Sequence, residues 1–105
     1  MNNLWYVAFA VACFTNLSPA FAGVPDKPYA EILAGKKYCL ACHNVNVKMV
    51  GPAYKDVAAK GEDVDVLVNS ILKGSGGKWG QIPMPPQPVT EEEARILAEW
   101  ILGLE

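Results

Sequence analysis

Three residues of the 105-residue chain lie close enough in sequence to act on one bound group, namely Cys39, Cys42 and His43. They form the pattern Cys-x-x-Cys-His, with two thiols one helical turn apart and an imidazole directly after them. This pattern is typical of c-type haem attachment, in which the thiols bond to the haem vinyl groups and the histidine binds the iron. The motif therefore predicts one covalent haem c, with Cys39 and Cys42 as thioether sites and His43 as an axial ligand.

Zinc binding and thiol redox chemistry are the alternatives for such a cysteine pair. A closed zinc site takes four ligands, usually Cys or His, but His43 is the only histidine of the chain. A thioredoxin-like pair lies in a βαβ pattern with its first cysteine at a helix N-terminus, whereas Cys39 follows a helical pattern. These residues therefore favour haem.

A second axial ligand would have to approach the iron from the face opposite His43. The donors that remain are Met49, Met84, a lysine or a tyrosine. Met49 can reach only about 20 Å from His43 in a fully extended chain, and it leads directly into Gly51-Pro52, so its simpler role is to fill the core. Met84 can reach the far face freely, and prolines on both of its sides restrict its backbone.

The elements that position these residues are predicted to be helices, so the expected fold class is all-α. Asp26 can cap a first helix that has Pro28 near its start, that ends near Gly35, and whose buried face is formed by Tyr29, Ile32 and Leu33. A short helix is expected over residues 53–60, after the break at Gly51-Pro52.

Two further helices follow. Asp63 or Asp65 begins the third and Gly74 ends it, with an apolar stripe of Val64, Leu67, Val68, Ile71 and Leu72. A capping box at Thr90 begins the last helix, whose stripe is Leu97, Trp100, Ile101 and Leu104. Residues 74–88 are rich in glycine and proline and are predicted to be a loop.

Residues 1–22 have the pattern of a cleaved signal peptide. The run from Leu4 to Phe14 is apolar, Ala20-Phe21-Ala22 matches a cleavage site, and the run is too short to span a bilayer. No basic residue precedes the run, and lipid attachment at Cys13 is a second possibility. Cleavage would leave residues 23–105 as one periplasmic domain without phenylalanine, and a domain so poor in core material usually needs a cofactor.

Three motifs, in this order, resemble the short bacterial branch of class I cytochrome c: Cys39 to His43, KMVGPAYKDVAAK from Lys48 to Lys60, and WGQIPMPP from Trp79 to Pro86. The resemblance covers nearly all of residues 25–105. It implies a small fold of about four helices wrapped round one covalently bound haem.

The resemblance also implies roles for single residues. His43 and Met84 would be the axial ligands, and the carbonyl of Pro52 would accept the His43 Nδ1 proton. Trp79 would meet a haem propionate, and Lys37 would lie near the same edge. The sequence departs from the family after Lys60, where it is shorter, and at two further positions: Ser70 stands where an arginine often holds a propionate, and Gln87 where an asparagine usually lies near the ligand sulfur.

Coordination by His and Met leaves no open position for a substrate and raises the reduction potential, so the expected function is one-electron transfer and not catalysis. The single histidine is used on iron, and Glu91 to Glu93 are explained as residues at a helix start. A ligand-binding or peroxidatic haem protein with a labile Met84 is the alternative. A helical domain without haem would leave the Cys-x-x-Cys-His motif unexplained.

Charge suggests how redox partners dock. Lysines dominate residues 27–60 and acids dominate residues 61–105, for a net charge of −2. The sequence therefore predicts that membrane or periplasmic redox enzymes dock at the haem edge, where Lys36, Lys37, Lys48 and Lys55 would steer acidic partners. Solvated helix faces explain the same lysines equally well. Nucleic acid is not an expected partner, and a monomer is expected.

Overall fold

The computed structural model describes residues 27–105, and the predicted signal peptide, Cys13 and the Asp26 cap lie outside them. Four α-helices and one 3-10 helix form the fold: α1 (Lys27–Lys36), η1 (Cys39–Ala41), α2 (Tyr54–Lys60), α3 (Val64–Lys73) and α4 (Glu91–Leu102). No strand occurs in residues 27–105, which confirms the all-α prediction. None of the helices in this part of the chain is long and apolar enough to cross a membrane.

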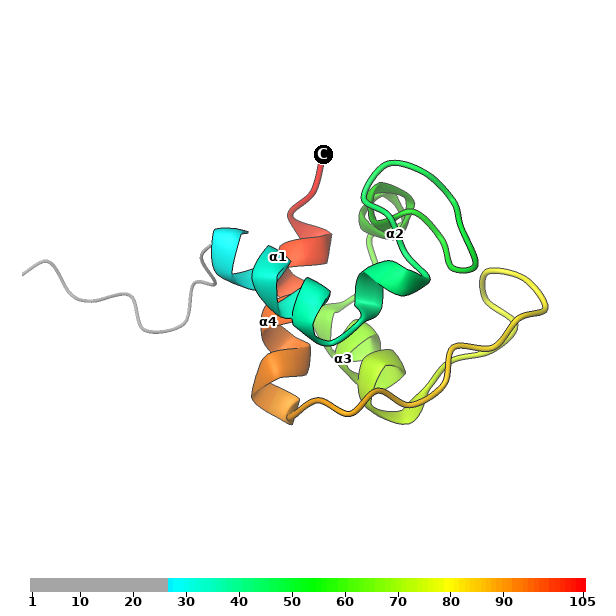
Figure 1. Ribbon diagram of the computed structural model, residues 1–105. Coiled ribbons are helices and arrows are strands. Elements are labelled where there is room, and N and C mark those ends of the chain that lie inside the picture. Colours follow the sequence, from blue (N-terminus) through cyan, green and yellow to red (C-terminus); the bar gives the residue numbers. More distant parts are fainter. Residues whose placement is uncertain (1–26) are drawn as a thin grey trace, which may run out of the picture.

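Helix α4 is the centre of the arrangement, because α1, α2 and α3 all pack against it (Figure 1). Thr90 begins α4 as predicted: its hydroxyl accepts from the Glu93 N–H at 3.1 Å, and the Glu93 carboxylate accepts from the Thr90 N–H at 2.9 Å. The bond from Thr90 and the nearby Lys37 ammonium lower the pKa of Glu93. The carboxylate is therefore charged at neutral pH, and its contribution to the cap is lost only as the pH falls through that lowered pKa.

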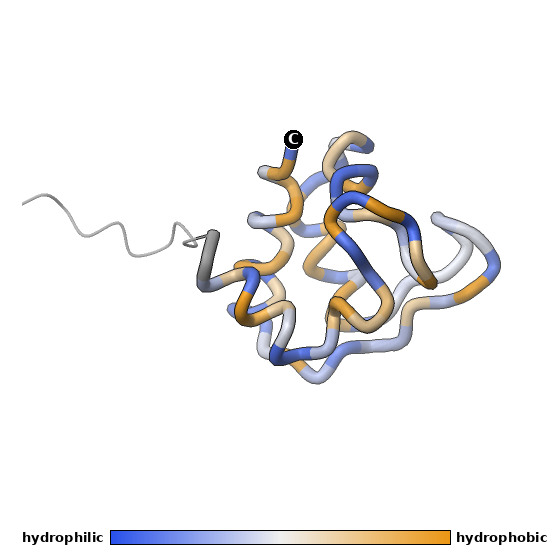
Figure 2. The backbone as a smooth tube through the Cα atoms, turned by 45° about the horizontal axis from the view of Figure 1, so that its top comes forward, coloured by the Kyte–Doolittle hydropathy of each residue, from blue (hydrophilic) through white to orange (hydrophobic). Residues whose placement is uncertain are grey.

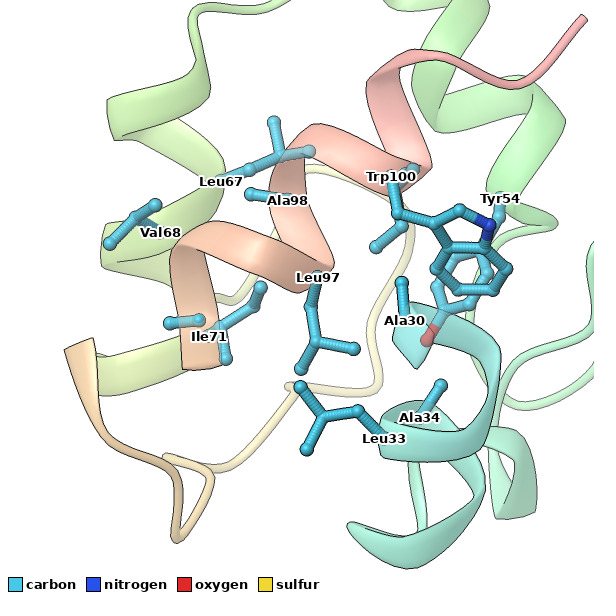
Figure 3. Close-up of a cluster of buried hydrophobic side chains, with 12 residues drawn as sticks. Ala30, Leu33, Ala34, Tyr54, Leu67, Val68, Ile71, Leu97, Ala98 and Trp100 are labelled. Atoms are coloured by element: carbon cyan, nitrogen blue, oxygen red, sulfur yellow. The ribbon is translucent and has the colours of Figure 1, made fainter. Parts of the chain in front are cut away.

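The core lies between α4 and the other helices (Figure 3). Small residues on α1 and α4 let these two helices approach closely, and larger apolar side chains of α3 and α4 fill the rest. The buried set consists of Ala30, Leu33, Ala34, Ala53, Tyr54, Leu67, Val68, Ile71, Ala94, Leu97, Ala98, Trp100 and Ile101. In Figure 2, apolar and polar residues alternate along the helices, as expected for helices that bury one face.

The prediction for the buried face of α1 is partly wrong. Leu33 is buried as expected, but Tyr29 is 49% exposed and Ile32 is 55% exposed. The face that meets α4 is formed by Ala30, Leu33 and Ala34, which share one stripe at the i, i+3, i+4 spacing. The prediction placed the large side chains Tyr29 and Ile32 on the buried face, whereas the close packing of α1 on α4 is made by alanines.

The helix boundaries agree closely with those predicted from the sequence. Helix α2 begins at Tyr54, one residue later than predicted, with Ala53 as its N-cap. Of the two candidate caps for α3, Asp63 is the one used, since its carboxylate accepts from the Asp65 N–H at 2.9 Å. Residues 74–88 form the predicted loop, with one isolated antiparallel bridge between Ser75 and Met84.

The capping box gives a direct stability test. Replacing Thr90 by Ala removes the hydroxyl acceptor and should lower the free energy of unfolding by about 1 kcal/mol. Denaturant unfolding followed by circular dichroism measures this, with Thr90→Ser as the control that keeps the hydroxyl and should stay near the parent. Equal midpoints for the parent and Thr90→Ala would contradict the role of the cap.

Candidate functional site

The imidazole of His43 is held by the residues just before α2. Its Nδ1 lies 2.8 Å from the carbonyl oxygen of Pro52, and because a carbonyl only accepts, Nδ1 carries the proton. This leaves the lone pair of Nε2 available to a metal. The backbone of Gly51 lies against the ring so closely that a Cβ there would sit 2.8 Å from Nδ1. Only glycine at position 51 therefore allows the backbone to lie this close to the His43 ring.

Tyr54 also packs on the His43 ring, and sequence reasoning gave it no role at the site. Its ring stacks on the His43 ring at a centroid distance of 4.8 Å, with 20° between the planes, and it meets Trp100 edge-on at 5.5 Å. Burial and the neighbouring Cys39 raise the pKa of the Tyr54 hydroxyl, which therefore stays protonated. The signal available in the sequence was its position two residues after Pro52, at a helix start.

The two motif cysteines lie in η1 and at its end, directly before His43. The N–H groups of Cys42 and His43 both donate to the Cys39 carbonyl, at 3.2 and 3.0 Å, so one tight turn positions all three side chains. Within the described part of the chain neither cysteine is in a disulfide, so both sulfurs are available for thioether bonds. Burial raises the pKa of the Cys39 thiol. The turn follows Tyr38, whose φ of 62° places a non-glycine residue in the left-handed region.

A cavity of about 530 Å³ lies beside these residues. Cys39, Cys42 and His43 line it together with Met84 from the 74–88 loop, and apolar side chains of the core line it as well. Its size falls within the roughly 300–1,000 Å³ typical of cofactor pockets. The combination of two thiols, an imidazole, a thioether and apolar walls fits a haem c: Cys39 and Cys42 would form the thioethers, and His43 and Met84 could bind the iron.

Met84 is held in a defined backbone position at the base of its loop. Its N–H donates to the Ser75 carbonyl at 2.7 Å, and its carbonyl accepts from the Ser75 N–H at 3.0 Å. A Cβ at Gly74 would lie 2.8 Å from the Met84 carbonyl oxygen, and Gly74 itself has a φ of 86°, so this contact also requires glycine. Met84 is half-buried and packs against the core cluster.

Met49 also lines the cavity, but its backbone is hydrogen-bonded to the segment that carries Gly51 and packs on His43. Its N–H donates to the Gly51 carbonyl at 3.1 Å, and the Gly51 N–H donates to the Cys42 carbonyl at 2.7 Å. These bonds join Met49 to the segment that packs on the imidazole. Met84 comes instead from the long loop between α3 and α4, which Figure 1 shows extending away from the helices. The two methionines therefore reach the cavity from different segments.

The other predicted residues are distributed unevenly. Trp79, Ser70 and Gln87 line the cavity. The Gln87 side-chain amide donates to the Pro85 carbonyl at 2.7 Å, within its own loop. Lys37 is not among the lining residues, and its ammonium pairs with Glu93 at 3.4 Å. The structure thus brings together all the predicted site residues except Lys37, whose place at the haem edge stays a prediction.

The helical fold and this site define a class of small haem-binding electron carriers, and comparison with known proteins agrees. Residues 30–105 match the Cytochrome c family model, and the chain belongs to the cytochrome c family. It is 60% identical over 78 residues to cytochrome c-551 of Stutzerimonas stutzeri, a match that covers 70% of this chain and 75% of that protein.

Two further relatives place the chain within the family. Cytochrome c-552 of Hydrogenobacter thermophilus is 53% identical over 78 residues, which cover 70% of this chain and 80% of that protein. The crystal structure of wild-type cytochrome c552 from Nitrosomonas europaea is similar with a TM-score of 0.68 and 50% identity, covering 71% of this chain and 99% of that chain.

Membership fixes the class of protein. The chain is a small class I cytochrome c, an electron-transfer protein and not an enzyme, and it carries a single covalent haem c with iron. The relatives lend no support to the ligand-binding or peroxidatic alternative.

Gly51 offers a test of the histidine position. Replacing it by Ala should displace the His43 ring and destabilise the haem-loaded protein by about 1–3 kcal/mol, the usual cost of an overpacked contact. Denaturant unfolding followed by the haem absorption measures this. The matched control is Gly35→Ala, because a Cβ at Gly35 in α1 meets nothing within 4 Å. Equal stabilities of the two variants would refute the proposed close approach.

Proposed function

We propose that this cytochrome c carries single electrons between periplasmic and membrane redox enzymes, using a haem whose iron is bound by His43 and Met84. The observation that carries the proposal is the cavity in which the Cys-x-x-Cys-His turn meets the Met84 loop. When bound, the haem supplies a reversible one-electron iron couple.

Each residue of the site has a distinct role in this proposal. Cys39 and Cys42 hold the cofactor covalently, so that it does not dissociate between encounters. The Pro52 carbonyl orients His43 and increases its basicity through the hydrogen bond at Nδ1. Met84 supplies a soft thioether, and His/Met ligation raises the reduction potential. If His43 and Met84 both hold the iron, electron transfer would need no exchange of ligands.

The prolines next to Met84 support its role as the sixth ligand. A thioether is a weak donor, and an unrestrained methionine would lose conformational entropy on binding the iron. Pro83 and Pro85 limit the backbone in advance, and the paired hydrogen bonds with Ser75 hold the backbone of Met84 itself. Much of the ordering is therefore already present before the sulfur meets the metal.

We also propose that residues 1–22 are a cleaved signal peptide and that residues 23–105 act in the periplasm as a monomer. Docking at the cavity mouth is consistent with the exposed side chains there: Met49 is 46% exposed, Val50 54% and Ile82 67%, and Lys48 lines the same cavity. A small apolar patch with a lysine near it suits brief encounters with partners, since apolar contact gives close approach and charge speeds association.

Covalent attachment and processing can be tested on one sample. The pigment should remain with the protein through acid-acetone extraction, and the mass should equal residues 23–105 plus one haem. Extraction of the pigment would refute thioether attachment at Cys39 and Cys42. A mass that still includes residues 1–22 would refute only the signal peptide, because the two results are independent.

Substitution of the methionines tests the sixth ligand. Met84→Ala should abolish the sulfur-to-iron charge-transfer band and lower the reduction potential substantially, since water or a weaker donor takes the vacated position. Met49→Ala is the matched control and should keep both properties. The reverse pattern, with the band lost in Met49→Ala and kept in Met84→Ala, would reassign the ligand.

A further inference from the structure

The outer part of the 74–88 loop has little backbone support. Residues 76–83, here called the loop tip, take part in no backbone–backbone hydrogen bond within the described part of the chain. The bonded pair Ser75 and Met84 closes the loop just below the tip. Since the tip contributes a wall of the cavity, some other interaction has to define its position.

Glu62 supplies that interaction from the turn between α2 and α3. Its carboxylate accepts from the ammonium of Lys78 at 2.8 Å and from that of Lys60 at 3.1 Å. Lys78 belongs to the loop tip, sixteen residues further along the chain. The Lys60 ammonium also lies 4.8 Å from the ring centroid of Trp79, the neighbour of Lys78. We call these four side chains, Lys60, Glu62, Lys78 and Trp79, the clasp.

The clasp lies at the cavity and not on a remote surface. Glu62, Lys78 and Trp79 all line the cavity that contains His43 and Met84. The Glu62 side chain is only 19% exposed, whereas most exposed ion pairs join two well-solvated groups. Hydrogen bonds from Lys78 and Lys60 also lower the pKa of Glu62, so the carboxylate is charged at neutral pH.

An isolated surface ion pair contributes little to stability, because solvent screens the charges and two long side chains lose freedom. The clasp differs in two respects. One carboxylate serves two ammonium groups, and one of these also makes a cation–π contact with an indole, the ring that binds cations best. In addition, residues 76–83 of the loop tip make no backbone–backbone hydrogen bonds that could fix its position independently of these weak interactions. Weak interactions are therefore sufficient to decide where the tip lies.

We propose that Glu62 is a positioning residue that holds the loop tip against the α2–α3 turn and so limits water access on the Met84 side of the cavity. The proposal rests on the haem ligation described above. It assigns no contact between Glu62 and the iron. Because Ser75 and Met84 remain paired below the tip, opening the clasp should leave Met84 ligated and change mainly the solvation of the site.

The test uses the haem-loaded protein with Glu62→Gln, Lys78→Gln and the double variant. Backbone order parameters of residues 76–82, measured by 15N NMR relaxation, should fall in each single variant from about 0.85, typical of a rigid backbone, toward about 0.6. The double variant should lose no more order than either single variant, because both changes remove the same interaction.

The matched control is Asp65→Asn. It breaks the Arg95–Asp65 pair, whose 2.9 Å distance is similar but which joins α3 to α4, and neither of its residues lines the cavity. This control should leave the order parameters of residues 76–82 unchanged. Raising the salt concentration should lower these order parameters in the parent but not in Glu62→Gln, since screening acts on the same ion pairs.

The reduction potential shows whether the clasp matters for the haem. Water entering the site stabilises the more highly charged oxidised iron, so both single variants should have a lower potential. Unchanged order parameters of residues 76–82, additive effects in the double variant, or opposite shifts of the potential in Glu62→Gln and Lys78→Gln would each overturn the proposal. Opposite shifts would mean that the two charges act only through space. The sulfur-to-iron band should persist in all variants, and its absence in the parent would instead refute the ligation.

Discussion

The orientation of a single imidazole constrains much of this small molecule. The His43 ring is fixed through its Nδ1 bond to the Pro52 carbonyl, by the backbone of Gly51 and by stacking on Tyr54. These three contacts come from neighbouring residues at the start of α2. Tyr54 also meets Trp100 on α4, so the histidine is connected rigidly to the central helix. The orientation of His43 and the packing of α2 on α4 are therefore parts of one arrangement.

The part of the cavity that Met84 lines is built differently. Met84 belongs to a long loop that the Ser75–Met84 pair closes on itself, and the bonds from the Gly74 N–H to the Ser70 carbonyl and from the Gln87 N–H to the Ile71 carbonyl join this loop to α3. Proline restricts the loop locally, while the side chains of the clasp position its tip. Of the two proposed iron ligands, His43 thus lies on the packed helices and Met84 on a loop restricted by prolines. This loop is the part where small changes in sequence would most readily alter the environment of the site.

The core and the cavity share side chains. Leu67, Ile71 and Leu97 are buried between the helices and also line the cavity, so the same residues that hold the helices together contact the cofactor region. Small domains bury a low fraction of their surface, and a large apolar cofactor adds the contact area that the chain itself lacks. Folding and haem binding in this family member are for this reason coupled through a few aliphatic side chains.

The sequence by itself determined the features that depend on neighbours along the chain: the Cys-x-x-Cys-His turn, the cap at Thr90, the approximate ends of the helices and the 74–88 loop. These follow from local spacing and from the backbone limits of glycine and proline. Only the tertiary structure decided which face of α1 is buried, that Tyr54 stacks on His43, that Lys37 pairs with Glu93 and that Glu62 binds the loop tip. Each of these is a contact between distant segments, set by how closely helices pack, and a pattern along one segment carries no information about its partner's position.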